Sequence, residues 1–137
     1  MDLAIKEAEK ALEMGEIPVG AVISSKGQIL ARCHNQTEQL QDVTAHAEIL
    51  AITAASNALG SKYLNDCTLY VSLEPCTMCA GALFWSQIGR IVIAARDEKR
   101  GFSKFDQSII HPKTKIEFGL EEARSQTLLK KFFKSIR

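Results

Sequence analysis

The chain has 137 residues, of which 46% are hydrophobic and 24% are charged. These values exclude a disordered chain, and the length predicts a single domain, residues 1–137, that can bury its core without disulfides. No apolar run approaches the roughly 18 residues that a membrane span needs, and Met1 opens a charged amphipathic stretch rather than a secretory leader. We therefore expect a cytoplasmic protein with no membrane partner.

The formal net charge of +1 conceals two halves of opposite sign. Residues 1–66 carry five Lys and Arg against nine Asp and Glu, whereas residues 67–137 carry twelve against seven. A basic half suits a polyanionic partner such as a nucleic acid. The alternative is that the basic C-terminal helix is only a solvated face.

The first 43 residues predict one helix, a β-hairpin and a loop. These elements lie at residues 2–14, 18–23, 28–33 and 35–43. Apolar residues recur at helical spacing before Gly15, which ends the helix. Ser24–Gly27 has the composition of a turn between two strands, and the polar stretch after the second strand lacks periodicity.

The rest of the chain alternates helices and strands. Helices are predicted at 45–59, 76–87 and 121–136 and strands at 67–73, 91–95 and 115–118, with 97–112 mostly irregular. Thr44 is the predicted N-cap of the first of these helices, and Gly60 follows its end. The strand at 67–73 is nearly all apolar and is predicted to be central, whereas 115–118 is a short edge strand. The complete order predicts an α/β fold, a three-layer α-β-α sandwich with one mixed five-stranded sheet.

Two motifs thirty residues apart predict a metal site, Thr44-Ala-His-Ala-Glu48 and Pro75-Cys-Thr-Met-Cys79. His46, Cys76 and Cys79 supply three ligands for one Zn²⁺, and a catalytic zinc, unlike a structural one, keeps its fourth position open for water. The i, i+3 spacing puts both sulfurs on one helix face. The positive end of the helix dipole favours the thiolate form that binds metal.

Each part of this pattern has other interpretations. A lone C-x-x-C occurs in redox pairs and in zinc ribbons, but the second C-x-x-C of a ribbon is absent and a redox pair needs no histidine partner. A lone histidine at a helix start is more often a cap or a core residue, and Glu48 alone would be an ordinary acid near a helix N-terminus. Together these residues predict a hydrolytic zinc site in which Glu48 carries protons from water to the substrate and its leaving group.

The combined H-x-E…P-C-x-x-C pattern resembles the signature of the zinc-dependent base deaminases. Further segments resemble the bacterial tRNA-specific adenosine deaminases, namely Gly15–Val22, Asn35, Thr44–Ile49, Leu69–Ala82 and Ala95–Asp97. This resemblance implies a cytidine-deaminase-like fold and hydrolytic deamination of the wobble adenosine of an arginine tRNA anticodon to inosine. It also implies a homodimer, for which the apolar Ala80–Trp85 segment is the candidate contact.

The resemblance further implies roles for five residues. Asn35 would hydrogen-bond the base, and Val19 and Ala47 would line the pocket around it. Asp97 and Lys99 would contact the neighbouring nucleotides of the anticodon loop.

Basic residues cluster in the stretch that follows the last of these motifs. They are Arg96, Lys99, Arg100, Lys104, Lys113 and Lys115. Phe102 and Phe105 interleave with them and suit stacking on bases, although core or dimer packing is an equal alternative. The family often has a small-residue run after Gly101, whereas this chain has Phe102-Ser-Lys-Phe-Asp106, so the resemblance does not extend to the RNA contacts of this loop.

Two other functions remain open at this point. A free-base deaminase, guanine deaminase in particular, shares the zinc signature, but Pro18-Val-Gly, Ala95-Arg-Asp97 and the basic second half disfavour it. A catalytically idle zinc protein that only binds RNA would not need both Glu48 and an open fourth position.

Overall fold

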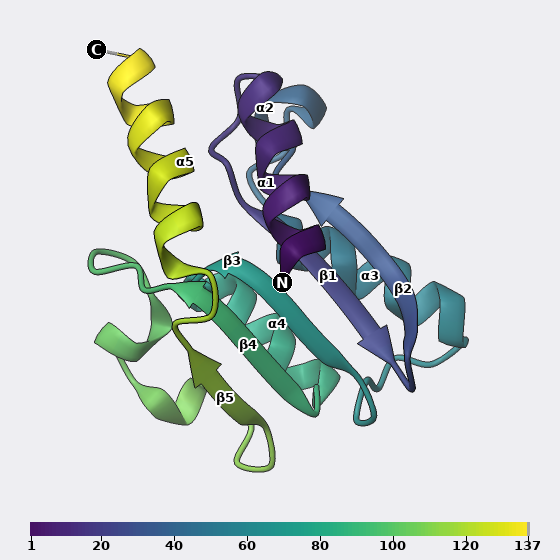
Figure 1. Cartoon of the computed structure of the whole chain (residues 1–137). Coiled ribbons are helices and arrows are strands. Elements are labelled where there is room, and N and C mark those ends of the chain that lie inside the picture. Colours follow the sequence, from purple (N-terminus) through teal and green to yellow (C-terminus); the bar gives the residue numbers. More distant parts are fainter. Residues whose placement is uncertain (137) are drawn as a thin grey trace.

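The structure of the chain, a computed structural model, describes residues 1–136, and Arg137, the last residue of the predicted domain, lies outside them. It contains one five-stranded sheet with helices on both faces (Figure 1). The strands are β1 (Gly20–Ser25), β2 (Gln28–His34), β3 (Thr68–Leu73), β4 (Arg90–Ala95) and β5 (Lys115–Phe118). The helices are α1 (Asp2–Glu13), α2 (Thr37–Leu40), α3 (Ala47–Leu59), α4 (Thr77–Ser86) and α5 (Glu122–Ser135), with short 3₁₀ turns η1 (Phe102–Lys104) and η2 (Gln107–Ile109).

The sheet is mixed, as predicted, with the strand order β2-β1-β3-β4-β5. β1 is antiparallel to β2 and β3, whereas β3, β4 and β5 run parallel to one another. The strand predicted to be central is confirmed, because β3 lies in the middle of the sheet with Leu69 and Val71 fully buried. The short strand β5 lies at one edge, also as predicted.

Helices form the two outer layers, so the predicted three-layer sandwich is confirmed. α1 and α5 pack together on one face, and α3 and α4 pack together on the other (Figure 1). α3 buries Ala47, Ala51 and Ala55 completely against the sheet, because residues four apart share one helix face. These small side chains let the helix lie close to the strands, which fixes the position of its first residue. No helix within residues 1–136 has the length and apolar character that crossing a bilayer requires.

The segments that carry the predicted site residues leave the sheet at one end. The strand register places the start of β1 beside the ends of β2 and β3, and the end of β3 beside the end of β4. Val19 precedes β1, while Asn35, Cys76 and Asp97 follow β2, β3 and β4. Sites in open α/β sheets commonly form where strands end in this way.

The starts of both site helices differ slightly from the prediction. The N-cap of α3 is His46 rather than Thr44, and α4 begins at Thr77 with Cys76 as its N-cap. Thr44 was predicted wrongly because it donates its backbone N–H and its hydroxyl to Asp42 Oδ1, at 2.8 and 2.7 Å, and so closes a turn before the helix.

The predicted loop at 35–43 contains one helical turn, α2. The carboxylate of Glu16, 1% exposed, accepts the backbone N–H groups of Glu38 and Gln39 at 3.0 and 2.8 Å. The first N–H groups of a helix need such acceptors, and here the acceptor comes from more than twenty residues earlier in the chain. The local sequence therefore carries no signal for this turn.

Glu7 of α1 joins this helix to β2. Glu7 is 3% exposed, and its carboxylate oxygens lie 3.0 Å from Lys10 Nζ, 3.2 Å from Arg32 Nη2 and 3.3 Å from His34 Nδ1. Burial alone raises the pKa of Glu7, but the hydrogen bonds from Lys10 and His34 and the charges of Lys10 and Arg32 outweigh it. The pKa therefore lies below its ordinary value of 4.5, and the fold stabilises the charged carboxylate.

We expect Glu7→Gln to lower the free energy of unfolding at pH 7 by about 1–3 kcal/mol, the usual cost of leaving buried partners unsatisfied. A carboxyl group with a depressed folded-state pKa contributes stability above its ordinary pKa, and this is lost as the pH falls through the folded value. The difference between wild type and variant, measured by urea unfolding, should therefore shrink from pH 7 to pH 3. An equal difference in the free energy of unfolding across this pH range would contradict the stabilising role of the Glu7 carboxylate.

Candidate metal centre and active site

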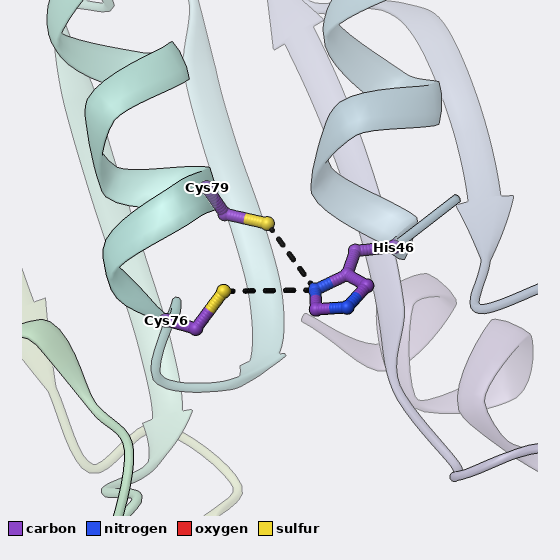
Figure 2. A group of neighbouring side chains, drawn as sticks. All are labelled: His46, Cys76 and Cys79. Atoms are coloured by element: carbon purple, nitrogen blue, oxygen red, sulfur yellow. Dashed lines mark hydrogen bonds between the residues drawn. The ribbon is translucent and has the colours of Figure 1, made fainter. Parts of the chain in front are cut away.

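The three predicted metal ligands lie at the N-termini of two neighbouring helices. His46 is the N-cap of α3, Cys76 is the N-cap of α4, and Cys79 lies in the first turn of α4 (Figure 2). Neither N-cap side chain bonds to its own helix, so both point into the space between the helices. Because α3 and α4 pack on the same face of the sheet, ligands thirty residues apart meet.

Both sulfurs converge on one nitrogen of the imidazole in Figure 2. His46 Nδ1 is 3.6 Å from Cys76 Sγ and 3.5 Å from Cys79 Sγ, and the three donor atoms all lie within 4.8 Å of one another. For a tetrahedral zinc with Zn–S of about 2.3 Å and Zn–N of about 2.0–2.1 Å, nitrogen and sulfur ligands stand about 3.6 Å apart. The donor set therefore fits zinc, and the nitrogen that faces the site is Nδ1, which the sequence does not specify.

The pKa values of the two thiols shift in opposite directions. The hydrogen bond from Cys79, with a further one from His46, lowers the pKa of Cys76 to about 4 despite its partial burial. The pKa of Cys79 is raised by its hydrogen bond to Cys76 and by burial, and that of His46 is raised by its hydrogen bond to Cys76. The three groups thus share protons that a divalent cation would displace, so metal binding should release protons.

Glu48 lies in the first turn of α3, two residues after the histidine ligand, and is 4% exposed. Burial raises the pKa of Glu48 to about 7, and the negative charge of Cys76 adds to this shift. The charged groups that influence this pKa include Cys76 and His46, so the carboxyl group lies close to the candidate metal donors. This is the position that a proton carrier between water and substrate requires.

Two of the three predicted base-pocket residues, Asn35 and Val19, meet where β1 begins. Asn35, 6% exposed, donates its backbone N–H to Val19 O at 3.0 Å and its side-chain N–H to Ile17 O at 3.2 Å. Its side-chain oxygen accepts the N–H of Thr37 at 3.3 Å. Val19 and Ala47 are 9% and 0% exposed and belong to the same buried cluster. The structure thus brings these residues to the end of the sheet that carries the metal donors.

Asp97 and Lys99 lie on the loop after β4. Asp97 Oδ1 accepts the backbone N–H groups of Lys99 and Arg100, both at 3.0 Å, so this carboxylate closes a turn. The side chains of Lys99 and Arg100 are exposed at the turn and remain available to a ligand.

The two interleaved phenylalanines have different environments. Phe102 is 1% exposed and packs in the main core, so base stacking is excluded for it and the alternative of core packing is right. Its backbone N–H donates to Pro75 O at 2.9 Å, which holds it beneath the metal-ligand segment. Phe105 is 61% exposed and remains a candidate for stacking.

Glu74 is a site residue that the sequence analysis missed. It is 3% exposed, and its carboxylate accepts the backbone N–H groups of Asp97 and Ser103 at 3.1 and 2.9 Å. The only signal in the sequence is an acid that directly follows an apolar strand and precedes the Pro75-Cys76 ligand segment. Its partners come from a loop more than twenty residues later, so this signal alone does not reveal the role.

Comparison with known proteins agrees with this geometry. A family model for the cytidine and deoxycytidylate deaminase zinc-binding region matches residues 1–95, a span that holds the three donors and Glu48. The chain belongs to the cytidine and deoxycytidylate deaminase family. Zinc is therefore its cofactor, as predicted from the motifs.

Individual relatives show which members of this family the chain resembles. The chain is 45% identical to a tRNA-specific adenosine deaminase of Aquifex aeolicus over 143 aligned positions, which cover all of this chain and 93% of the relative. A solved structure from work on A-to-I editing by tRNA:A34 deaminases at the wobble position of transfer RNA covers 94% of this chain and 97% of its own, with 41% identity and a TM-score of 0.88. A guanine deaminase structure from Bacillus subtilis covers 78% of this chain and 69% of its own, with 39% identity and a TM-score of 0.68. The predicted resemblance and the cytidine-deaminase-like fold are confirmed.

We expect Glu48→Ala to retain zinc but to lose about 10²–10⁴ in deamination rate, the usual contribution of a general acid–base group. Metal analysis and single-turnover assays of the purified variant measure the two effects separately. Cys79→Ala is the matched control, because it removes a ligand and should lose zinc as well as activity. Full activity of Glu48→Ala would refute the proton-carrying role.

Proposed function

We propose that this protein is a zinc-dependent hydrolase that converts the wobble adenosine of an arginine tRNA anticodon to inosine. The observation that carries the proposal is the convergence of His46 Nδ1 and the sulfurs of Cys76 and Cys79 beside the buried Glu48 carboxyl group. Within residues 1–136 this group has three protein donors rather than four, which suits a catalytic zinc. The full-length similarity to tRNA-specific adenosine deaminases supports this substrate among those known in the family.

The reaction assigns a separate task to each group. His46, Cys76 and Cys79 would hold the zinc, which when bound supplies a Lewis acid that lowers the pKa of a water from about 15.7 toward about 7. Glu48 accepts a proton from the attacking water and donates it to the purine ring nitrogen next to the reacting carbon, and later protons pass through it to the amino group. A C–O bond forms first as the ring nitrogen is protonated, which makes the reacting carbon tetrahedral. The C–N bond then breaks, and the protonated amino group leaves as ammonia.

The base pocket in this proposal is formed by Asn35, Val19 and Ala47. The Asn35 amide is held by Ile17 and Thr37, so its orientation is set before a base arrives. Val19 and Ala47, which belong to one buried cluster, would provide the apolar walls of this pocket. An anticodon loop presents unstacked bases, so an adenosine can turn into such a pocket at modest cost.

The RNA backbone would lie along the loop after β4. Asp97 shapes this loop, and Lys99 is exposed on it. All six basic residues of the stretch 96–115 are exposed. Arg96, Lys99, Arg100 and Lys104 follow β4 and would contact phosphates, whereas Lys115 pairs with Arg90 at the start of β4, at the other end of the sheet. A tRNA partner is in turn consistent with a single deaminase domain, residues 1–137, that works in the cytoplasm.

The second candidate is a guanine deaminase, which the 39% identity to the Bacillus subtilis structure favours. Its shorter coverage and lower TM-score make it the weaker candidate.

Parallel assays with arginine tRNA, free guanine and free cytosine distinguish the candidates. We expect the zinc-loaded protein to release ammonia and form inosine only with the tRNA, because the exposed basic stretch adds binding energy that a free base cannot use. Nucleoside analysis of the digested RNA measures inosine. Xanthine from guanine without inosine from tRNA would replace the proposal with guanine deamination, and no ammonia from any base would leave only an RNA-binding zinc protein.

We also propose a homodimer that uses the outer face of α4. This helix is apolar on all sides, which is typical of a helix that is buried on all sides. Its outer face nevertheless leaves Trp85 77% exposed and Met78 38% exposed. Gly81 and Ala82 lie between them at helical spacing, and their small size allows a second copy to approach closely.

Trp85→Asp should therefore convert a dimer into a monomer, because it places a charge at the centre of the apolar contact. Light scattering after size-exclusion chromatography should give the 15.1 kDa mass of one chain for the variant and twice that mass for wild type. Tyr63→Asp, which changes an aromatic side chain that is 43% exposed elsewhere, is the control and should stay dimeric. A dimeric Trp85→Asp would show that α4 is not the contact.

A further inference from the structure

Glu74 is a buried acid that is not among the metal donors. It directly follows β3, where its backbone N–H donates to Ala95 O at 2.8 Å. Both of its carboxylate oxygens face the loop after β4. Oε1 accepts the backbone N–H of Asp97 at 3.1 Å, and Oε2 accepts the backbone N–H and the hydroxyl of Ser103 at 2.9 and 2.5 Å. One carboxylate therefore holds both ends of the segment 97–103, here called the clamped loop.

The hydrogen bonds of the Glu74 carboxylate come from this loop. Across residues 1–136, none of the ion pairs includes Glu74. Its negative charge is stabilised by the N–H and O–H groups of the clamped loop, and a buried charge that loses its donors is costly. The carboxylate and the loop therefore stabilise each other.

Gly101 lies against the same carboxylate. A Cβ atom at this position would fall within 3.0 Å of three carboxyl atoms of Glu74, closer than real Cβ atoms approach their neighbours. The backbone of Gly101 has φ −62° and ψ 145°, which any residue adopts. Glycine is therefore required here by the carboxylate and not by the backbone conformation.

The clamped loop is also joined to the metal-ligand segment. Gly101 forms an isolated antiparallel bridge with Cys76, and Phe102 donates its N–H to Pro75 O at 2.9 Å. The two residues before this bridge, Lys99 and Arg100, are exposed. A fixed loop therefore presents two cations at a fixed distance from the metal centre.

We propose that Glu74 is a positioning residue that clamps the 97–103 loop, and with it Lys99 and Arg100, onto the backbone of the metal-ligand segment. The proposal rests on the proposed function, because it assigns these cations to RNA phosphates. Glu74 acts through the loop and does not touch the reacting atoms. Its expected effect is on the binding of RNA rather than on the chemical step.

Hydrogen exchange of the zinc-loaded protein without RNA tests the clamp directly. Glu74→Gln keeps the side-chain volume but replaces one acceptor oxygen with an N–H donor, so the amides of Asp97 or Ser103 should exchange about tenfold faster. Gly101→Ala should have the same effect, because its methyl group pushes the carboxylate away. In a Glu74→Ala background, Gly101→Ala should add nothing, since the opposing atoms are gone.

Steady-state kinetics with an arginine anticodon stem-loop test the consequence. Glu74→Gln should raise KM about tenfold with kcat changed less than about threefold, and zinc content should stay at the wild-type level. Glu98→Gln is the matched control, because it makes the same chemical change on the same loop at an exposed side chain and should leave KM at or below the wild-type value. Removal of a negative charge by itself would strengthen RNA binding. Weaker RNA binding by Glu74→Gln would therefore come from the loss of the clamp and not from the change in charge.

Each outcome is decisive. Unchanged exchange in Glu74→Gln, or an equal Gly101→Ala effect with and without the carboxylate, overturns the clamp. Loss of zinc, or a fall in kcat at constant KM, overturns it too, because Glu74 would then serve the metal centre. If wild type is inactive on tRNA but exchange follows the expected pattern, the clamp stands and the proposed function fails. If wild type is active on tRNA but the exchange pattern is absent, the proposed function stands and the clamp fails.

Discussion

The convergence of three donor atoms from two helix N-termini is the constraint on which the rest of the structure depends. For His46 to meet the two cysteines, α3 and α4 must lie side by side on one face of the sheet. The buried alanines of α3 set how close that helix lies to the strands, and the central strand β3 delivers the cysteine segment to the same end of the sheet. A metal with short, directional bonds tolerates little error in this arrangement.

Buried carboxylates organise the loops around this centre. Glu16 accepts N–H groups from α2, and Glu74 accepts them from the loop after β4. Glu48 instead lies in the first turn of α3 beside the candidate metal donors, where burial raises its pKa to about 7. The first two acids therefore hold main chain in place, while the third is the acid that we propose as the proton carrier. The same chemical group has a structural role or a chemical role according to what surrounds it.

Much of this could be predicted from local patterns. Apolar periodicity located the five strands and the four long helices, and the two short motifs identified three side chains that the fold brings together, because metal ligands occur at fixed spacing on helix starts. The features that were missed depend on partners distant in the sequence. Thr44 is a plausible N-cap by residue type, but its hydroxyl donates to Asp42 instead of capping α3. The helical turn α2 depends on the Glu16 carboxylate, which accepts its N–H groups. Phe102 lies among basic residues in the sequence, yet only the fold shows that it is buried in the core. Which imidazole nitrogen faces the two sulfurs likewise becomes clear only from the folded positions of His46, Cys76 and Cys79.

The contact between Glu16 and α2 has a consequence for engineering. Residues 35–45 look like an exchangeable surface module, but the acceptor that shapes them lies before β1, and Asn35 is tied to the same stretch through Ile17 and Val19. A graft that replaces only residues 35–45 would leave the first turn of α2 without the Glu16 carboxylate that accepts its N–H groups. It would also remove the hydrogen bond from Asn35 to Ile17 O. The smallest unit that can be transplanted with these contacts intact runs from residue 16 to residue 45, hairpin included.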